Sequence, residues 1–142
     1  SLDIERGQRI AILAESRPEW AIADLACQMI GAISVPMFST LPAMQVKGIL
    51  HDCGASLIFV STKSQLKKIL DIAAELPDLK RVVIMDEIEE TPLVPHLLSW
   101  KQLEDDGKNF DLSQPATYES CWPAASPNDI ATIIYTSGTT GE

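Results

Sequence analysis

The residues of this chain best suited to chemistry form one short run of hydroxyl side chains and glycines: Thr136, Ser137, Gly138, Thr139, Thr140 and Gly141. Glycine lets a backbone approach a ligand closely, and successive N–H groups in such a turn form a concave nest for phosphate oxygens. The four hydroxyls add rotatable donors and can also face a metal ion. The run therefore predicts an anion-binding loop that suits phosphate.

The same run is also typical of a plain turn, because Gly, Ser and Thr gather in ordinary turns. It does not match the Walker pattern, since no lysine follows a suitably spaced glycine. Its context favours phosphate: the β-branched run 130–135 leads directly into it and predicts a final strand. Open α/β sheets bind ligands at the carboxyl ends of their strands, which is where this loop belongs.

Short apolar runs upstream predict the sheet that positions the loop. They predict buried strands at 9–13, 32–36, 56–60 and 81–85. Pro36 is expected to close the second of these, because proline cannot donate to a strand ladder. Helices are expected between the strands, so the chain predicts a doubly wound α/β fold with a mostly parallel sheet and helices on both faces.

Turn and cap residues predict where these helices begin and end. Candidate N-caps and first-turn prolines mark the starts, and glycines or proline mark the ends. The predicted starts are Ser16 with Pro18, Ser39 with Pro42, and Ser64; the predicted ends are Gly31, Gly54 and Pro77. Residues 86–129 differ, being acidic and proline-containing, and predict an irregular surface connection with one short helix from Ser99 to Gly107.

Composition limits the function classes. The net charge is −9, and 71–142 carry fourteen of the twenty acidic groups, which argues against a nucleic-acid partner. Three cysteines without a C-x-x-C pair favour reduced thiols and a cytoplasmic location, and none has metal-ligand spacing. The most apolar window, 21–38, contains Asp24, Gly31 and Pro36, which favours a buried helix and strand over a membrane span.

The run 135–141, Tyr-Thr-Ser-Gly-Thr-Thr-Gly, resembles the signature of the adenylate-forming enzymes. This family includes acyl-CoA synthetases, luciferases and peptide-synthetase adenylation domains. There the segment continues with a variable residue and Pro-Lys-Gly; Glu142 stands at the variable place, and the chain stops before the rest. Upstream, the segments similar to long-chain fatty acid CoA ligases are 7–13, 16–20, 31–36, 41–42 and 52–55.

This resemblance implies that residues 1–142 are part of the N-terminal AMP-binding domain of a longer acyl-CoA ligase, with 86–129 as a connection within it. It implies that 136–141 hold the β- and γ-phosphates of ATP, accompanied by Mg²⁺. In the implied reaction, a fatty acid carboxylate attacks the α-phosphorus of ATP to give an acyl-adenylate and pyrophosphate. The thiol of coenzyme A then takes the acyl group and releases AMP.

The family's metal-binding glutamate, adenine pocket, acyl tunnel and catalytic lysine lie downstream, so no catalytic residue or metal ligand is assigned here. We therefore expect the 142 residues alone to be inactive. We also expect them to self-associate or to leave the loop disordered, because a sheet cut at its last strand leaves edges and apolar faces uncovered. Peripheral membrane association of the parent enzyme stays open. Two alternatives remain: a free-standing α/β binding or regulatory domain with a structural turn, and an adenylating enzyme with a different acceptor.

Overall fold

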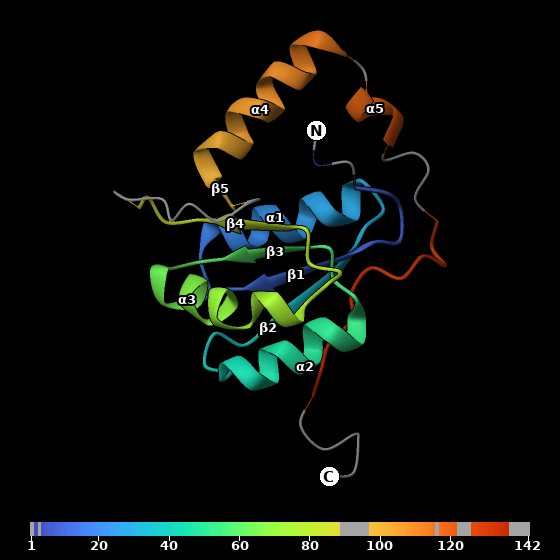
Figure 1. Cartoon of the computed structure of the whole chain (residues 1–142). Helices are drawn as coiled ribbons and strands as arrows, with labels where there is room; N and C mark the ends of the chain where they lie inside the picture. Colours follow the sequence, from blue (N-terminus) through green and yellow to red (C-terminus); the bar gives the residue numbers. More distant parts are fainter. Residues whose placement is uncertain (1, 3, 89–96, 116, 122–125, 137–142) are drawn as a thin grey trace.

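The strands form one five-stranded parallel sheet (Figure 1), in a computed structural model that describes residues 2, 4–88, 97–115, 117–121 and 126–136. The spatial order is β2-β1-β3-β4-β5, with every neighbouring pair parallel. The strands are β1 (Arg9–Leu13), β2 (Ile33–Met37), β3 (Leu57–Val60), β4 (Arg81–Ile84) and β5 (Leu97–Ser99). The order reverses between β1 and β3, as in other doubly wound sheets.

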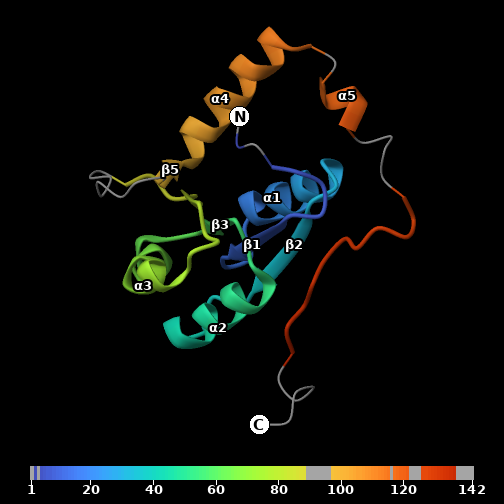
Figure 2. The same cartoon turned by 45° about the vertical axis from the view of Figure 1, so that its right-hand side comes forward.

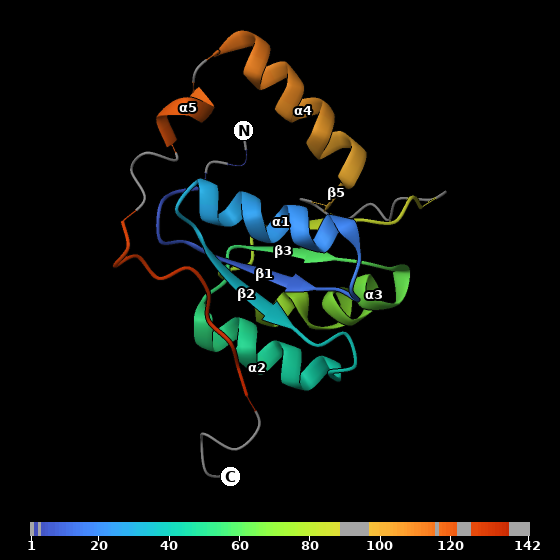
Figure 3. The same ribbon diagram turned by 180° about the vertical axis from the view of Figure 1, so that it is seen from behind.

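Helices cover both faces of this sheet, which confirms the predicted fold class (Figures 1 and 3). One face carries α1 (Pro18–Met29) and the first turn of α4 (Trp100–Ser113). The other face carries α2 (Ala43–Cys53) and α3 (Lys63–Ile72), and α3 continues into the short 3₁₀ helix η1 (Ala73–Glu75). A short helix, α5 (Thr117–Cys121), follows α4.

The period of two along each strand divides the core into two layers. In β1, Ile10 and Ile12 face the layer under α1, whereas Ala11 and Leu13 face the layer under α2 and α3. All four side chains are buried, because helices cover both faces, and this explains why the strands are continuous apolar runs. A slip of one residue in any central strand would exchange the two layers.

The helix ends were predicted better than the helix starts. Gly31 and Gly54 have φ of 72° and 58° where α1 and α2 end, as expected of glycine in the left-handed region. Ser16 does not cap α1: Arg17 takes the N-cap position without a side-chain bond, and Pro18 is the first helical residue. The caps of α2 and α3 also shift, to Pro42 and Thr62, and Thr62 rather than Ser64 accepts a hydrogen bond from Gln65.

The prediction that 86–129 is irregular, apart from one short helix, was wrong for much of this segment. It contains β5, which adds a fifth parallel strand, and α4, which continues through Gly107 to Ser113. A capping box starts α4, since Ser99 accepts from the Gln102 amide and the Gln102 side chain accepts from the Ser99 amide. A single glycine costs a helix only about 1 kcal/mol, so Gly107 does not end it.

The predicted final strand at 130–135 is reduced to a single parallel bridge between Ser34 and Thr132. Ser34 donates its amide to the Ala131 carbonyl at 3.1 Å and accepts from the Ile133 amide at 2.9 Å. The next outward-facing residue of β2 is Pro36, which has no N–H to continue this ladder. Pro36 pairs with Ile12 within β2, so it does not end β2 as predicted. Instead, it ends the pairing of residues 131–133 along the outer edge of β2.

Candidate functional site

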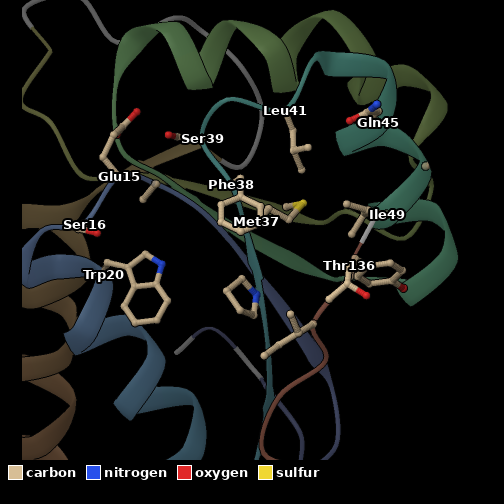
Figure 4. Close-up of a pocket in the computed structure, with 15 residues that line it drawn as sticks. Glu15, Ser16, Trp20, Met37, Phe38, Ser39, Leu41, Gln45, Ile49 and Thr136 are labelled. Carbon is tan, nitrogen blue, oxygen red and sulfur yellow. The ribbon is translucent and has the colours of Figure 1, made fainter. Parts of the chain in front are cut away.

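A cavity of about 960 Å³ lies at the carboxyl ends of β1 and β2 (Figure 4). Its walls come from the segments that follow these two strands, from α1, from α2 and from the end of the described chain. The side chains in Figure 4 include the aromatic rings of Trp20 and Phe38 and the polar groups of Glu15, Ser39 and Gln45. The cavity occupies the edge of the sheet where α/β folds bind ligands.

Of the six residues predicted to hold phosphate, the structure describes only Thr136. Thr136 is exposed and lines the cavity together with Ile134 and Tyr135. Ser137, Gly138, Thr139, Thr140 and Gly141 lie outside the described residues. The start of the predicted loop is thus at the rim of the cavity, and the phosphate-binding role of all six residues stays a prediction.

One wall of the cavity contains Glu15, which lies two residues after the end of β1 and is held by hydrogen bonds from residues behind the wall. Its carboxylate accepts from the Ser61 hydroxyl and, at 3.1 Å, from the Gln65 amide nitrogen. The Ser61 hydroxyl is the main cause that lowers the pKa of Glu15, while partial burial opposes it. Ser61 and Gln65 are buried, so the carboxylate is held from inside the fold.

The segment that follows β2 is held in place by α3. Gln65 Nε2 donates to the Ser39 carbonyl at 2.9 Å. Lys68 Nζ donates to the carbonyls of Ser39 and Leu41 at 2.8 and 2.9 Å. These bonds fix the backbone on either side of Thr40 and directly after Phe38, and Phe38 stays 73% exposed at the cavity. The cavity thus has a fixed backbone rim and an exposed aromatic side chain.

Arg17 ties together the next strand ends along this edge. Its guanidinium donates to Asp86, after β4, and to Glu19, in the first turn of α1, both at 2.7 Å. The same group reaches the Ser61 carbonyl at 3.4 Å. These carboxylates raise the pKa of Arg17, with Glu19 the larger cause, and Arg17 in turn lowers the pKa of Glu19. The carboxyl ends of β3 and β4 are therefore anchored to α1.

Tyr135 connects the end of the described chain to α2, which Figure 2 shows beside it. Its hydroxyl donates to Asp52 Oδ2 at 2.5 Å, and its ring packs against the core layer under α2. Desolvation is the main cause that raises the pKa of Tyr135, and the Asp52 carboxylate adds to it. The residue before the predicted loop is therefore fixed by both an apolar and a polar contact.

Sequence reasoning named Thr136, which lines the cavity, but it did not name Glu15, Ser39 or Gln65 as site residues and did not pair Tyr135 with Asp52. Glu15 and Ser39 had a usable signal, since they follow predicted strands by two and three positions and parallel strands end at one edge. The pairing of Tyr135 with Asp52 had none, because these residues lie 83 positions apart.

Neither a cluster of metal ligands nor a membrane-spanning helix is found in the part of the chain that the structure describes. Within it, no group of three or more His, Cys, Asp or Glu side chains is placed to hold a metal ion. No helix in the same residues is long and apolar enough to cross a membrane. Cys27 and Cys53 are free and buried, as expected for reduced thiols.

Curated relatives of this chain carry the names of long-chain fatty acid CoA ligases. ACSBG2 of Xenopus laevis is 34% identical over 99% of this chain and 18% of its own length. FadD15 of Mycobacterium bovis is 34% identical over 99% of this chain and 22% of its own length. The chain therefore spans about a fifth of the length of these relatives.

Solved structures show the same fold. The anthranilate CoA ligase AuaEII, in complex with anthranoyl-AMP, matches with a TM-score of 0.77 and 27% identity, over 99% of this chain and 24% of that one. Coronafacic acid ligase of Pectobacterium brasiliense matches with a TM-score of 0.69 and 22% identity, over 94% of this chain and 24% of that one. The family model described as AMP-binding enzyme matches residues 1–142. The chain therefore belongs to the AMP-binding enzyme family.

Proposed function

We propose that this chain is part of an ATP-dependent long-chain fatty acid CoA ligase, in which it supplies the loop that holds the β- and γ-phosphates of ATP. The observation that carries the proposal is the position of Thr136, at the rim of a cavity on the carboxyl edge of a parallel sheet. The names of the relatives support the substrate class, since they are long-chain fatty acid CoA ligases.

The donor set of the loop fits a polyphosphate. Residues 136–141 offer four hydroxyls and a run of backbone N–H groups, including those of two glycines, and carry no acidic side chain. In the proposed reaction these donors stabilise the negative charge that collects on pyrophosphate while the carboxylate of the fatty acid attacks the α-phosphorus. That is catalysis by preorganised hydrogen-bond donors.

Mg²⁺ and coenzyme A complete the proposed reaction. Mg²⁺ would neutralise phosphate charge, and the hydroxyl oxygens of Thr136 and its neighbours suit it as ligands, whereas the described residues provide no carboxylate cluster for it. Coenzyme A is the acyl acceptor in the second step. We assign no residue of this chain to coenzyme A.

The test is ATP–pyrophosphate exchange and acyl-CoA formation by the protein expressed over the full open reading frame that contains these residues. We expect exchange that depends on a long-chain fatty acid, with a loss of about 10²-fold in Thr139→Val, the size usual for one transition-state donor. Thr40→Val, in the loop after β2, is the matched control. We also expect no ligase activity from residues 1–142 alone.

A second candidate is an enzyme that adenylates a different acid, which the match to an anthranilate CoA ligase favours. A panel of long-chain fatty acids, aromatic acids and amino acids in the exchange assay separates the two. Exchange with an aromatic or amino acid alone would support the second candidate. No exchange with any acid would favour a binding domain whose 136–141 segment is a structural turn.

We also propose a cytoplasmic location and no nucleic-acid partner. The free buried thiols and the net charge of −9 support these proposals. A relative in Arabidopsis thaliana, 34% identical, is named a peroxisomal long chain acyl-CoA synthetase. Imaging of the tagged full-length protein would distinguish the two compartments, and would also show any peripheral membrane association.

A further inference from the structure

The segment that leads into the predicted loop leaves the sheet at a defined point. Residues 131–133 pair with Ser34 of β2, but Pro36, two residues further along β2, has no amide proton for the Ile133 carbonyl. Residues 134–136 line the cavity instead, beside α2. Something other than the sheet must therefore hold the backbone that precedes the loop.

Tyr135 provides a connection of this kind. Its hydroxyl bonds to Asp52 in the last turn of α2, and its ring packs on the core beneath that helix. Asp52 is itself well placed, since α2 is anchored by Val46 and Leu50, which are buried. The bond thus runs from a fixed helix to the residue directly before Thr136.

We propose that Tyr135 and Asp52 are positioning residues for the loop 136–141, acting on its phosphate donors through the backbone. The nature of the ligand rests on the proposed function; the placement of the backbone does not. Preorganised donors act only when held close to the geometry of the bound phosphate, so a looser attachment weakens ATP binding.

The main alternative is that Tyr135 only fills space under α2. Phenylalanine separates these roles, because Tyr135→Phe keeps the ring and its packing and removes only the donor. Asp52→Ala removes the acceptor, while Asp52→Asn keeps an amide oxygen that accepts. If the hydrogen bond matters, Tyr135→Phe and Asp52→Ala have similar effects, and Asp52→Asn has a smaller one.

The experiment measures ATP–pyrophosphate exchange in the full-length protein for these variants and for Tyr135→Phe/Asp52→Ala together. We expect the KM for ATP to rise about three- to tenfold in Tyr135→Phe and in Asp52→Ala, since one hydrogen bond to a charged group is lost, and to rise less in Asp52→Asn. We expect kcat to change less and the melting temperature to stay near that of the wild type. The double variant should be no worse than the worse single variant, because both remove the same contact. The control is Asp24→Ala, at an α1 carboxylate that accepts from Gln28.

An unchanged KM for ATP in Tyr135→Phe, or fully additive effects in the double variant, would overturn the proposal while leaving the proposed function intact. If the wild type shows no exchange, the proposed function fails, and the backbone is then tested in the full-length protein by hydrogen–deuterium exchange. We expect the amides of 136–141 to exchange faster in Tyr135→Phe than in the wild type. Equal exchange rates would overturn the positioning role itself.

Discussion

Arg17 and Asp86, which lie 69 positions apart in the chain, form an ion pair of 2.7 Å that joins the start of α1 to the end of β4. The Arg17 side chain is only 24% exposed, so water and salt shield this pair less than an open surface pair. The second carboxylate, Glu19, fixes the other side of the guanidinium. Arg17 thus connects the first turn of α1 with the residues that follow β3 and β4.

Replacing Arg17 should therefore destabilise the fold. We expect Arg17→Gln to lower the free energy of unfolding by about 1–2 kcal/mol, measured by urea denaturation of residues 1–142. The control is Lys108→Gln, whose 3.7 Å contact with Asp105 joins two exposed side chains, with an expected loss below about 0.5 kcal/mol. Equal losses of unfolding free energy in the two variants would show that the contacts of Arg17 stabilise the fold no more than an exposed ion pair does.

The lowered pKa values of Glu15 and Glu19 predict acid sensitivity. Both carboxylates stay ionised to lower pH in the folded protein than in the unfolded chain, where glutamate titrates at about 4.3. Their contribution to stability is therefore present above that pH and is lost as the pH falls through the lowered folded-state values. Urea midpoints measured from pH 7 to pH 3 should fall less steeply for Glu15→Gln and Glu19→Gln than for the wild type. Asp71→Asn, on the exposed side of α3, controls for the loss of one acidic charge; a wild-type slope in both glutamate variants would refute the assignment.

Replacement by alanine should change the stability of the protein in opposite directions at Gly48, inside α2, and at Gly54, its C-cap. Gly54 has a φ of 58°, and an added Cβ would lie 2.9 Å from Arg9 Nη2, so Gly54→Ala should destabilise the protein by about 1 kcal/mol or more. Gly48 lies inside the helix with open space around a Cβ, so Gly48→Ala should stabilise it by about 0.5–1 kcal/mol. Thermal unfolding of both variants checks the signs, and two changes of the same sign would contradict this reading of α2.

Burial should protect the described thiols from reaction. It raises the pKa of Cys27 to about 12 and also raises the pKa of Cys53. In a Cys121→Ser background, a disulfide reagent should label the native protein at least about 10²-fold more slowly than the urea-unfolded protein, since the thiolate is the reactive form. Rapid labelling of both thiols in the native protein would mean that the two core layers open easily.

Self-association of residues 1–142 remains a prediction, and α1 offers a place for it. Ile22 and Leu25 are 53% and 57% exposed on this helix, an unusual place for adjacent large apolar side chains. Sedimentation velocity should show a weight-average mass that rises with concentration, and Ile22→Lys/Leu25→Lys should reduce the rise. The control is Leu112→Lys, which replaces one exposed apolar side chain of α4. A monomer at all concentrations in which residues 136–141 are also ordered would contradict the prediction that the fragment self-associates or leaves this loop disordered.

The predictions from sequence were accurate where one local rule acts alone. The first strand was predicted at its observed bounds because a run of five apolar or amphipathic residues is buried on both faces. The ends at Gly31 and Gly54 followed from backbone geometry that glycine adopts without strain. The start of α1 was displaced from Ser16 by one residue, because Pro18 can begin a helix without a side-chain cap.

The errors came from interactions between distant residues. Residues 130–135 do pair with the sheet, but only through one bridge. The extent of pairing depends on the neighbouring strand, β2, whose Pro36 cannot donate a hydrogen bond. The continuation of α4 through Gly107 is supported by a distant contact of Trp100, whose ring meets that of Phe59 edge-on at 6.0 Å. The same limit applies to the candidate site. Thr136 lies in a motif that can be recognised from the sequence, whereas only the fold determines that Tyr135 pairs with Asp52.

The outer edge of β2 has a consequence for how copies of this protein can meet. Its outward positions offer no spare amide, since Ser34 donates to Ala131 and Pro36 has no proton to donate, and Ala32, directly before β2, donates to Cys27. A strand from another molecule would find no donors there, so this edge is protected against the edge-to-edge pairing that leads to amyloid-like aggregates. On this side of the sheet, contact between copies is therefore left to side chains rather than to backbone pairing.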